Sequence, residues 1–135
     1  MSVVSIRSAL ETALAAISPP IATAWENDAF TPPDLETPYQ AAFLMLAQPD
    51  NTEIGPQHVQ RGIFQVSLFY PLAAGTAAVN ARAEMVRAAF RRGLSLTSGG
   101  IIVTVEKTAE IGPGAIADDR FVLPVRVRFY APVPN

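Results

Sequence analysis

The segment from Arg61 to Pro71, RGIFQVSLFYP, constrains the fold more than any other part of this sequence. In an extended strand successive side chains point to opposite faces of a sheet. One face would carry Phe64, Val66, Leu68 and Tyr70, and the other Arg61, Ile63, Gln65, Ser67 and Phe69. Pro71 ends the pattern because proline cannot donate a backbone hydrogen bond. The alternation therefore predicts a long strand over residues 59–70 with one apolar, core-forming face.

An amphipathic helix is expected shortly after this strand. Thr76 is a typical N-cap residue, and Gly93 is a typical helix stop. Arg91 and Arg92 suit the negative end of the helix dipole. Helical spacing gives a buried stripe of Val79, Ala83, Val86 and Phe90 and a polar stripe of Asn80, Glu84, Arg87 and Arg91. Together these signals predict a helix of about fifteen residues.

The remaining elements are less sharply marked. Apolar periodicity predicts a helix over 3–17 that Pro19 and Pro20 terminate. The expected strands cover 21–25, 39–48, 101–107 and 121–130, and residues 94–96 either pair with the third of these or lead into it.

Three features of these strands bear on the sheet. Residues 39–48 are apolar on both faces, which indicates a central strand covered on both sides or a sheet face buried by a partner. Pro124 lacks a ladder donor and predicts an edge strand or a bulge. We expect 131–135 to be extended and exposed, and the polar segment 49–56 to be a mobile hairpin loop.

The resulting fold class is α+β. Two main helices should pack on a mostly antiparallel or mixed sheet of four to five strands, and residues 1–135 should form a single domain.

The composition points to partners. Half of the residues are hydrophobic and only 16% are charged, against about a quarter in typical soluble domains. One basic and seven acidic residues give 1–60 a charge of −6, whereas nine basic and five acidic residues give 61–135 a charge of +4. Either the two halves intermix in one fold, or an acidic surface of one subunit meets a basic surface of the next.

Several kinds of chemistry find no support. The chain has no cysteine, so disulfides and Cys-based metal sites are excluded. No apolar run approaches the length of a membrane span or a secretory signal, and the net charge of −2 argues against a sequence-specific nucleic-acid binder. His58 is expected to be a solvated loop residue where the loop enters a strand, and no residue at nearby sequence spacing is suited to position it as a general base. Asp118 and Asp119 are interpreted as turn formers rather than metal ligands. We therefore expect no catalytic, cofactor or metal site.

A proline-rich, acidic arm over 26–38 follows Trp25 and contains Phe30. These aromatic residues would either anchor in a pocket of a neighbouring subunit or hold the arm against its own domain.

Six segments together resemble one known family. They are Trp25 with Phe30-Thr31-Pro32-Pro33, Arg61-Gly62-Ile63-Phe64-Gln65-Val66, Phe69-x-Pro71, Gly75-Thr76, Phe90-Arg91-Arg92-Gly93-Leu94, and Val125-Arg126-Val127-Arg128-Phe129. In this order they are similar to the tail terminator-like proteins of long-tailed bacteriophages, from about residue 5 to residue 131.

The resemblance implies a structural virion protein without enzymatic activity or cofactor. It implies a homo-oligomeric ring, a hexamer on the tail, that ends polymerisation of the tube and provides the head-joining surface. The implied partners are other copies of the chain, the major tail tube protein and a head-completion or neck protein. The protein would be made in the bacterial host cytoplasm and would reside at the head-proximal end of the virion tail.

The family pattern carries no catalytic residues, so the candidate site is an interface. By position, the loop 49–57 would contact the tube or the ring. The candidate interface charges are Asp50, Glu53, Arg61, Arg91, Arg92, Arg126 and Arg128. Arg126 and Arg128 point the same way because they lie two residues apart on a strand, and with Arg61 on the same sheet face they would form either a basic patch for a partner or a solvated outer face. Two alternatives stay open: a neck or head–tail connector subunit, and a small-molecule-binding domain or enzyme, for which His58 is the obvious titratable candidate.

Overall fold

The computed structural model describes residues 2–51 and 55–134 of the chain. Two helices, α1 (Ser2–Ala15) and α2 (Ala77–Ala89), pack on one face of a large, curled mixed sheet. The strands are β1 (Ala22–Ala24), β2 (Tyr39–Leu46), β3 (Gln57–Pro71), β4 (Ser95–Ser98), β5 (Ile101–Val105), β6 (Glu110–Ile111), β7 (Ala115–Ala117) and β8 (Arg120–Pro134). The α+β class is confirmed. Among the described residues, no helix is long and apolar enough to span a membrane.

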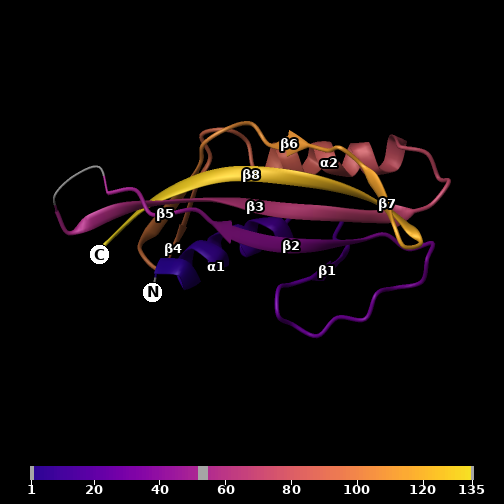
Figure 1. Ribbon diagram of the computed structural model, residues 1–135, viewed down its shortest axis with the longest axis horizontal. Coiled ribbons are helices and arrows are strands. Elements are labelled where there is room, and N and C mark those ends of the chain that lie inside the picture. Colours follow the sequence, from indigo (N-terminus) through magenta and orange to yellow (C-terminus); the bar gives the residue numbers. More distant parts are fainter. Residues whose placement is uncertain (1, 52–54, 135) are drawn as a thin grey trace.

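Two long strands form the axis of the molecule. β3 and β8 each contain 15 residues and pair antiparallel along their whole length, from Gln57 opposite Pro134 to Pro71 opposite Arg120. They run side by side along the longest dimension of the molecule (Figure 1). The sheet order is β1-β2-β3-β8-β5-β4, with β6 and β7 also paired to β8. Among the strands of the described residues, only β1 and β2 pair in parallel.

The core lies between the helices and one face of this sheet. Phe64, Val66 and Leu68 of β3 are completely buried, as the alternation predicts, and Tyr70 packs partly buried at the margin. The predicted stripe of α2 is also confirmed: Val79, Ala83, Val86 and Phe90 are at most 1% exposed. Ile6, Leu10 and Leu14 complete the core from α1.

The predicted number of four to five strands is too low, because the sheet has eight. β6 and β7 contain only two and three residues, too few for an alternating pattern to appear in the sequence. Residues 94–96 belong to a hairpin with β5, and Gly99 and Gly100 supply the positive φ angles of its turn, 56° and 80°.

The edge-strand alternative for Pro124 is wrong, and the prediction of an extended, exposed tail is confirmed only in part. β8 is an interior strand with β3 on one side and β5, β6 and β7 on the other, although it contains Pro124. The Pro124 carbonyl accepts a hydrogen bond from Gly112 N–H, so the proline nitrogen also faces the break between β6 and β7, where no donor is needed. The tail is extended, as expected, because the strand continues to Pro134, but only its alternate residues are exposed: Pro132 and Pro134 face solvent, whereas Ala131 and Val133 are completely buried.

The helix α2 is slightly shorter than expected. It contains 13 residues and begins after Thr76, whose side chain makes no capping hydrogen bond. It ends before Phe90, and Gly93 follows with a φ of 86°. Gly93 N–H then donates to the Val105 carbonyl, which joins the end of the helix segment to β5.

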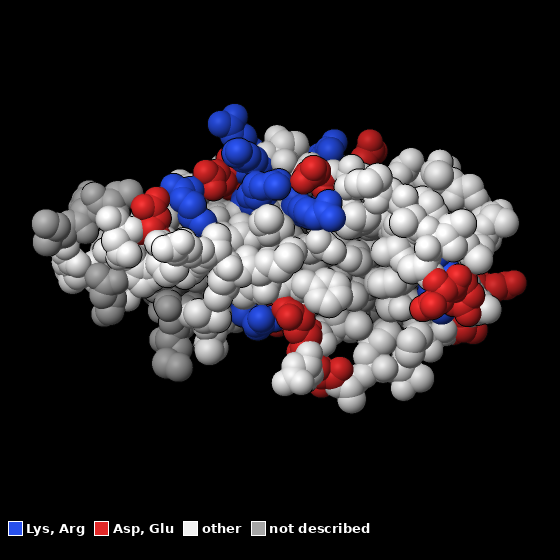
Figure 2. Space-filling model, in the orientation of Figure 1, with Lys and Arg blue, Asp and Glu red and all other residues white. Residues whose placement is uncertain are grey.

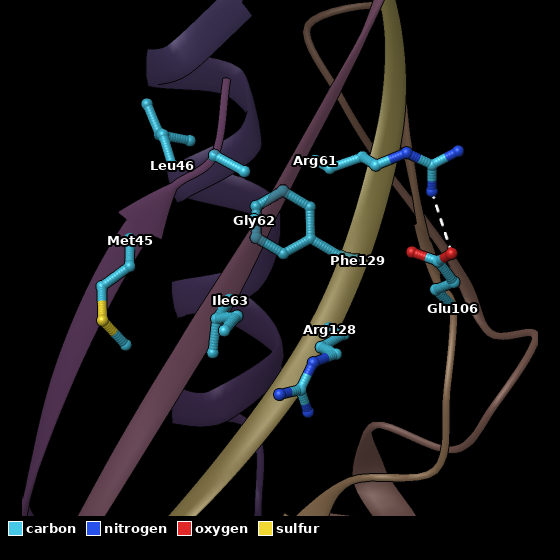
Figure 3. Close-up of a pocket in the computed structure, with 9 residues that line it drawn as sticks. Met45, Leu46, Arg61, Gly62, Ile63, Glu106, Arg128 and Phe129 are labelled. Carbon is cyan, nitrogen blue, oxygen red and sulfur yellow. Dashed lines mark hydrogen bonds and ion pairs between the residues drawn. The ribbon is translucent and has the colours of Figure 1, made fainter. Parts of the chain in front are cut away.

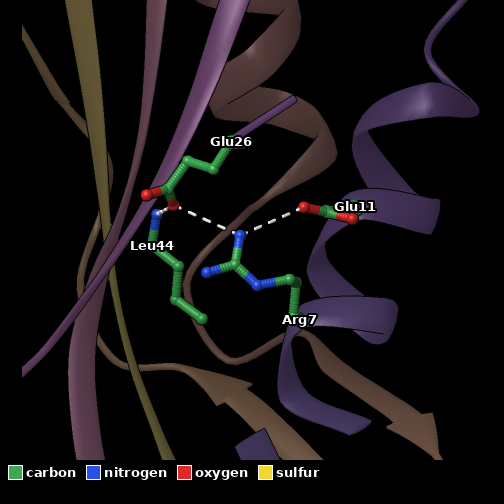
Figure 4. Close-up of polar contacts among 4 residues, drawn as sticks. All are labelled: Arg7, Glu11, Glu26 and Leu44. Atoms are coloured by element: carbon green, nitrogen blue, oxygen red, sulfur yellow. Dashed lines mark hydrogen bonds and ion pairs between the residues drawn. The ribbon is translucent and has the colours of Figure 1, made fainter. Parts of the chain in front are cut away.

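A charged cluster closes the outer side of β2 beyond the short strand β1. Glu26 accepts a hydrogen bond from the backbone N–H of Leu44 at 2.6 Å and also binds Arg7 of α1 at 3.2 Å (Figure 4). Arg7 binds Glu11 as well, at 3.3 Å. An edge strand with free donors invites pairing with another chain. The Glu26 carboxylate occupies one such donor and ties α1 to the sheet edge.

Candidate assembly interface

The second face of the sheet is not covered by the helices. We call it the open face, and β2, β3 and β8 contribute its side chains by strict alternation. These are Tyr39, Ala41, Phe43, Met45, Arg61, Ile63, Gln65, Ser67, Phe69, Arg120, Val122, Pro124, Arg126, Arg128 and Tyr130. Phe43 is 39% exposed and Met45 is 43% exposed, which leaves two large apolar side chains of β2 open to solvent. Of the two alternatives for residues 39–48, the structure favours a sheet face available to a partner.

The arm 26–38 covers one end of the open face. Arg120 is buried, and its guanidinium donates hydrogen bonds to the carbonyls of Pro33, Asp34 and Thr37 at 2.7–2.9 Å. It also lies 4.8 Å from the centre of the Tyr39 ring.

Aromatic contacts continue this attachment. The Tyr39 ring stacks on Phe69 with centroids 4.5 Å apart and meets Phe30 at 5.2 Å. Trp25 packs partly buried against the core. The arm is therefore held against its own domain, which was the simpler of the two alternatives.

The uncovered end of the open face contains an apolar groove of about 360 Å³. It lies where β2 ends beside β3 and β8, and Figure 3 shows Met45, Leu46, Ile63 and Phe129 around Gly62. Glycine is required here, because a Cβ on residue 62 would come within 2.7 Å of the Met45 carbonyl oxygen and 2.8 Å of the Phe129 ring. Arg61, Arg128 and Glu106 provide the polar rim of the groove.

The arginines beside the groove are matched by carboxylates. Arg61 binds Glu106 at 2.9 Å and lies 3.8 Å from Asp50, and Arg128 binds Glu110 at 3.2 Å. Arg126 donates to the side-chain oxygen of Gln65 at 3.1 Å and to the Gly112 carbonyl at 3.2 Å. The predicted basic surface of Arg61, Arg126 and Arg128 on one sheet face exists, but its charge is largely compensated. In Figure 2 the Lys and Arg side chains gather along β8 with Asp and Glu among them, above an uncharged area over β2 and β3.

The structure brings together four of the seven predicted interface residues: Asp50, Arg61, Arg126 and Arg128. Asp50 forms a backbone bridge with Val59, so strand pairing extends into the predicted loop 49–56. Arg91 and Arg92 are exposed beyond the end of α2 rather than on the open face. Glu53 lies outside the described residues. His58 belongs to β3, opposite Val133, and is not the loop residue that we expected.

Sequence reasoning missed the apolar members of this surface and the role of Arg120. The apolar residues on both faces of 39–48 were the sequence signal that could have identified Phe43 and Met45 as part of the open face. Nothing in the sequence marks Gly62 as the lining of a groove, and the partners of Arg120 are more than 80 residues away along the chain.

No arrangement on this surface suggests a reaction. Among residues 2–51 and 55–134, no group of three or more His, Asp or Glu side chains is placed to hold a metal ion. The perturbed groups lie elsewhere: burial raises the pKa of Tyr70, opposed by the charge of Arg82, and burial lowers the pKa of Arg82. Arg82 donates to the Pro19 carbonyl beneath α2, which is a structural contact. The fold is that of a small α+β protein with one sheet face closed by its own helices and one face that the helices leave open.

Comparison with known proteins identifies the family. Residues 5–129 match the family model described as phage tail terminator protein, and the chain belongs to this family. One solved structure is 28% identical with a TM-score of 0.73, and the alignment covers 93% of this chain and 92% of the other. No curated protein matches the sequence.

The family is structural and not catalytic, so the protein is a structural component of a phage tail that associates with other tail components. The resemblance stated from the sequence is thus confirmed, and the open face is the part of the described structure best suited to that association.

Proposed function

We propose that this chain acts as one domain that caps the phage tail tube. Copies of it would form a ring at the head-proximal end of the tail and bind the last layer of tube subunits. This ring would stop further polymerisation and present a surface for head joining. The major tail tube protein and a head-completion or neck protein would be its partners, and the hexameric state implied by the family resemblance is part of this proposal.

The open face carries the proposal. β2 exposes Phe43 and Met45, and β2, β3 and β8 together border a mostly apolar groove. The two helices cover only the opposite face of the sheet. Exposed apolar surface of this kind marks protein–protein contacts. The compensated charges around it are suited to orientation of a partner rather than to tight binding of a polyanion. Family membership supplies the class of partner.

The test is tube-length control in vitro. The major tail tube protein is polymerised with and without this protein, and tube lengths are measured by electron microscopy. We expect added protein to arrest elongation and to appear as a disc at one tube end. Met45→Asp should abolish arrest, because a carboxylate on the open face would be desolvated at the contact.

Ala81→Asp on the exposed side of α2 is the matched control and should still arrest elongation. Unchanged tube lengths with the native protein would refute the capping role. Binding to head-completion proteins without binding to tubes would instead assign the chain to the connector alternative.

A further inference from the structure

Two surfaces at opposite ends of the molecule differ in shape and in the charge around them. The first is the tip formed by β7 and the turn into β8, which we call the knob. Ile116 is 71% exposed there, the highest value among the large exposed hydrophobic side chains of the described residues, and alanines flank it at 115 and 117. The second is the groove at Gly62. β8 begins at the knob and reaches the groove at Phe129, so the two surfaces are separated by most of the long axis (Figure 1).

The groove has room for the knob. Its volume of about 360 Å³ equals about twelve water molecules at ~30 Å³ each. That exceeds what the four carbons of an isoleucine side chain need. Met45 and Ile63 would flank the inserted side chain above Gly62 and the buried Phe129 ring, and this burial would remove the most exposed large aliphatic side chain of the described residues from water.

The charges around the two surfaces have opposite signs. Arg120 holds the arm beside the turn into β8, so four carboxylates gather at the knob end: Asp34, Glu36, Asp118 and Asp119. Among the described residues, the cation at this end is Arg120 itself. The local charge is therefore −3.

The groove end carries the reverse balance. Gly93 N–H binds the Val105 carbonyl, and Val105 precedes the groove residue Glu106. This bond brings the chain segment of Arg91 and Arg92 to the same end of the sheet as the groove, although these two residues do not line it, and Lys107 follows Glu106 directly. With Arg61, Arg126 and Arg128 they make six cations against the three carboxylates Asp50, Glu106 and Glu110, which leaves +3. Within the described part of the chain, no ion pair engages Arg91, Arg92, Lys107, Asp118 or Asp119.

We propose that the occupant of the groove is a second copy of this chain, which inserts Ile116 while its acidic turn faces Arg91 and Arg92. The contact joins different surfaces of identical subunits, so each copy keeps one knob and one groove free for further copies. A fixed rotation at every contact then closes a ring. This inference rests on the proposed ring and names the surfaces that form it.

Charge reversal tests the pairing. A knob variant, Glu36→Lys with Asp119→Lys, changes the knob end from −3 to +1, by two reversals of two units each. Asp118 is left unchanged because its φ of 55° disfavours most other residues. A groove variant, Arg91→Glu with Arg92→Glu, changes the groove end from +3 to −1 by the same count. Oligomers are measured by native mass spectrometry and sedimentation, free in solution and on tail tubes.

We expect each variant alone to lose self-association by at least tenfold, and an equimolar mixture to regain it in particles that contain equal numbers of the two chains. Ile116→Asp should lose association as well, whereas Glu84→Lys on the exposed side of α2 should leave it unchanged. Thermal unfolding of every variant checks that the fold is intact.

Failure of the mixture to assemble, or self-association of either variant at the native level, would overturn the knob-and-groove pairing. A native protein that stays monomeric free and on tubes would also overturn it. Tube length is scored separately: arrest of tubes with unchanged variants refutes only the pairing, and rescued rings that never arrest tubes refute only the capping role.

Discussion

The two faces of the sheet are built from alternate residues of the same strands, yet they serve different purposes. On the helix-covered face, Phe64 and Val66 are completely buried among side chains from α1 and α2. On the open face, the neighbouring strand presents Phe43 and Met45 to solvent. A shift of one residue along a strand moves a side chain from the core to the partner surface. Substitutions can therefore affect folding and assembly separately, because a side chain on one face of the sheet does not contact the side chains on the other.

The largest expected effect comes from a phenylalanine on each face. Phe64→Ala removes a fully buried ring that packs 5.8 Å from Phe90, and it should lower the free energy of unfolding by about 3–5 kcal/mol. Phe43→Ala on the open face should cost less than about 1 kcal/mol but weaken assembly. Urea unfolding followed by circular dichroism measures the first quantity, and sedimentation measures the second.

If Phe64→Ala does not fold, Phe64→Leu serves instead with a smaller loss of about 1–1.5 kcal/mol. Equal destabilisation by the Phe64 and Phe43 variants would contradict the assignment of separate duties to the two faces.

A second, intermediate effect distinguishes the covered end of the open face from its free end. Arg120→Ala removes three hydrogen bonds to the arm and the contact with the Tyr39 ring. It should lower the free energy of unfolding by about 2–3 kcal/mol and increase hydrogen exchange of backbone amides near Thr37. The control is Arg126→Ala, whose partners are one side-chain oxygen and one carbonyl. Protection of the arm that is unchanged in Arg120→Ala would show that aromatic packing alone holds it.

The smallest expected effect concerns the groove. Gly62→Ala introduces a Cβ that must displace the Met45 carbonyl or the Phe129 ring, and overpacking of this kind costs about 1–3 kcal/mol. Gly55→Ala is the matched control, because its Cβ would meet nothing within 4 Å. Thermal melts compare the two variants. A Gly62→Ala protein as stable as Gly55→Ala would mean that the strands can separate at this point, and the groove would then be less rigid than its contacts indicate.

Local patterns accounted for most of the secondary structure and for the core. The period-two alternation of 61–70 and the helical stripe from Val79 to Phe90 are dense signals, and both were confirmed. The errors arose where the structure depends on contacts between residues that are far apart in the sequence. Pro124 was read as an edge signal, but a break between two very short strands accommodates it inside the sheet. Residues 131–134 were expected to be extended but exposed, and two of them are buried because β3 provides a pairing partner more than 70 residues earlier in the chain.

For the interface, sequence reasoning identified the charges better than the shape. It placed Arg61, Arg126 and Arg128 on one face, because residues two apart on a strand point the same way. It did not predict that Asp50, Glu106 and Glu110 compensate them, since ion pairs join residues from different strands and loops. The split into an acidic and a basic half partly disappears in space for the same reason, and the net imbalance that remains lies at the two ends of the molecule.

The sequence by itself determined the α+β class, the two helices, the long strand and its core face, and the family, since all of these depend on local periodicity and on the order of short motifs. Only the tertiary structure decided the eight-stranded sheet, the attachment of the arm by Arg120 and the groove at Gly62. The physical reason is that pairing between distant strands and the space left by a missing side chain depend on which segments meet. The strand Arg61–Tyr70 shows both sides of this division: its alternation is written in the chain, whereas what covers each face depends on the rest of the fold.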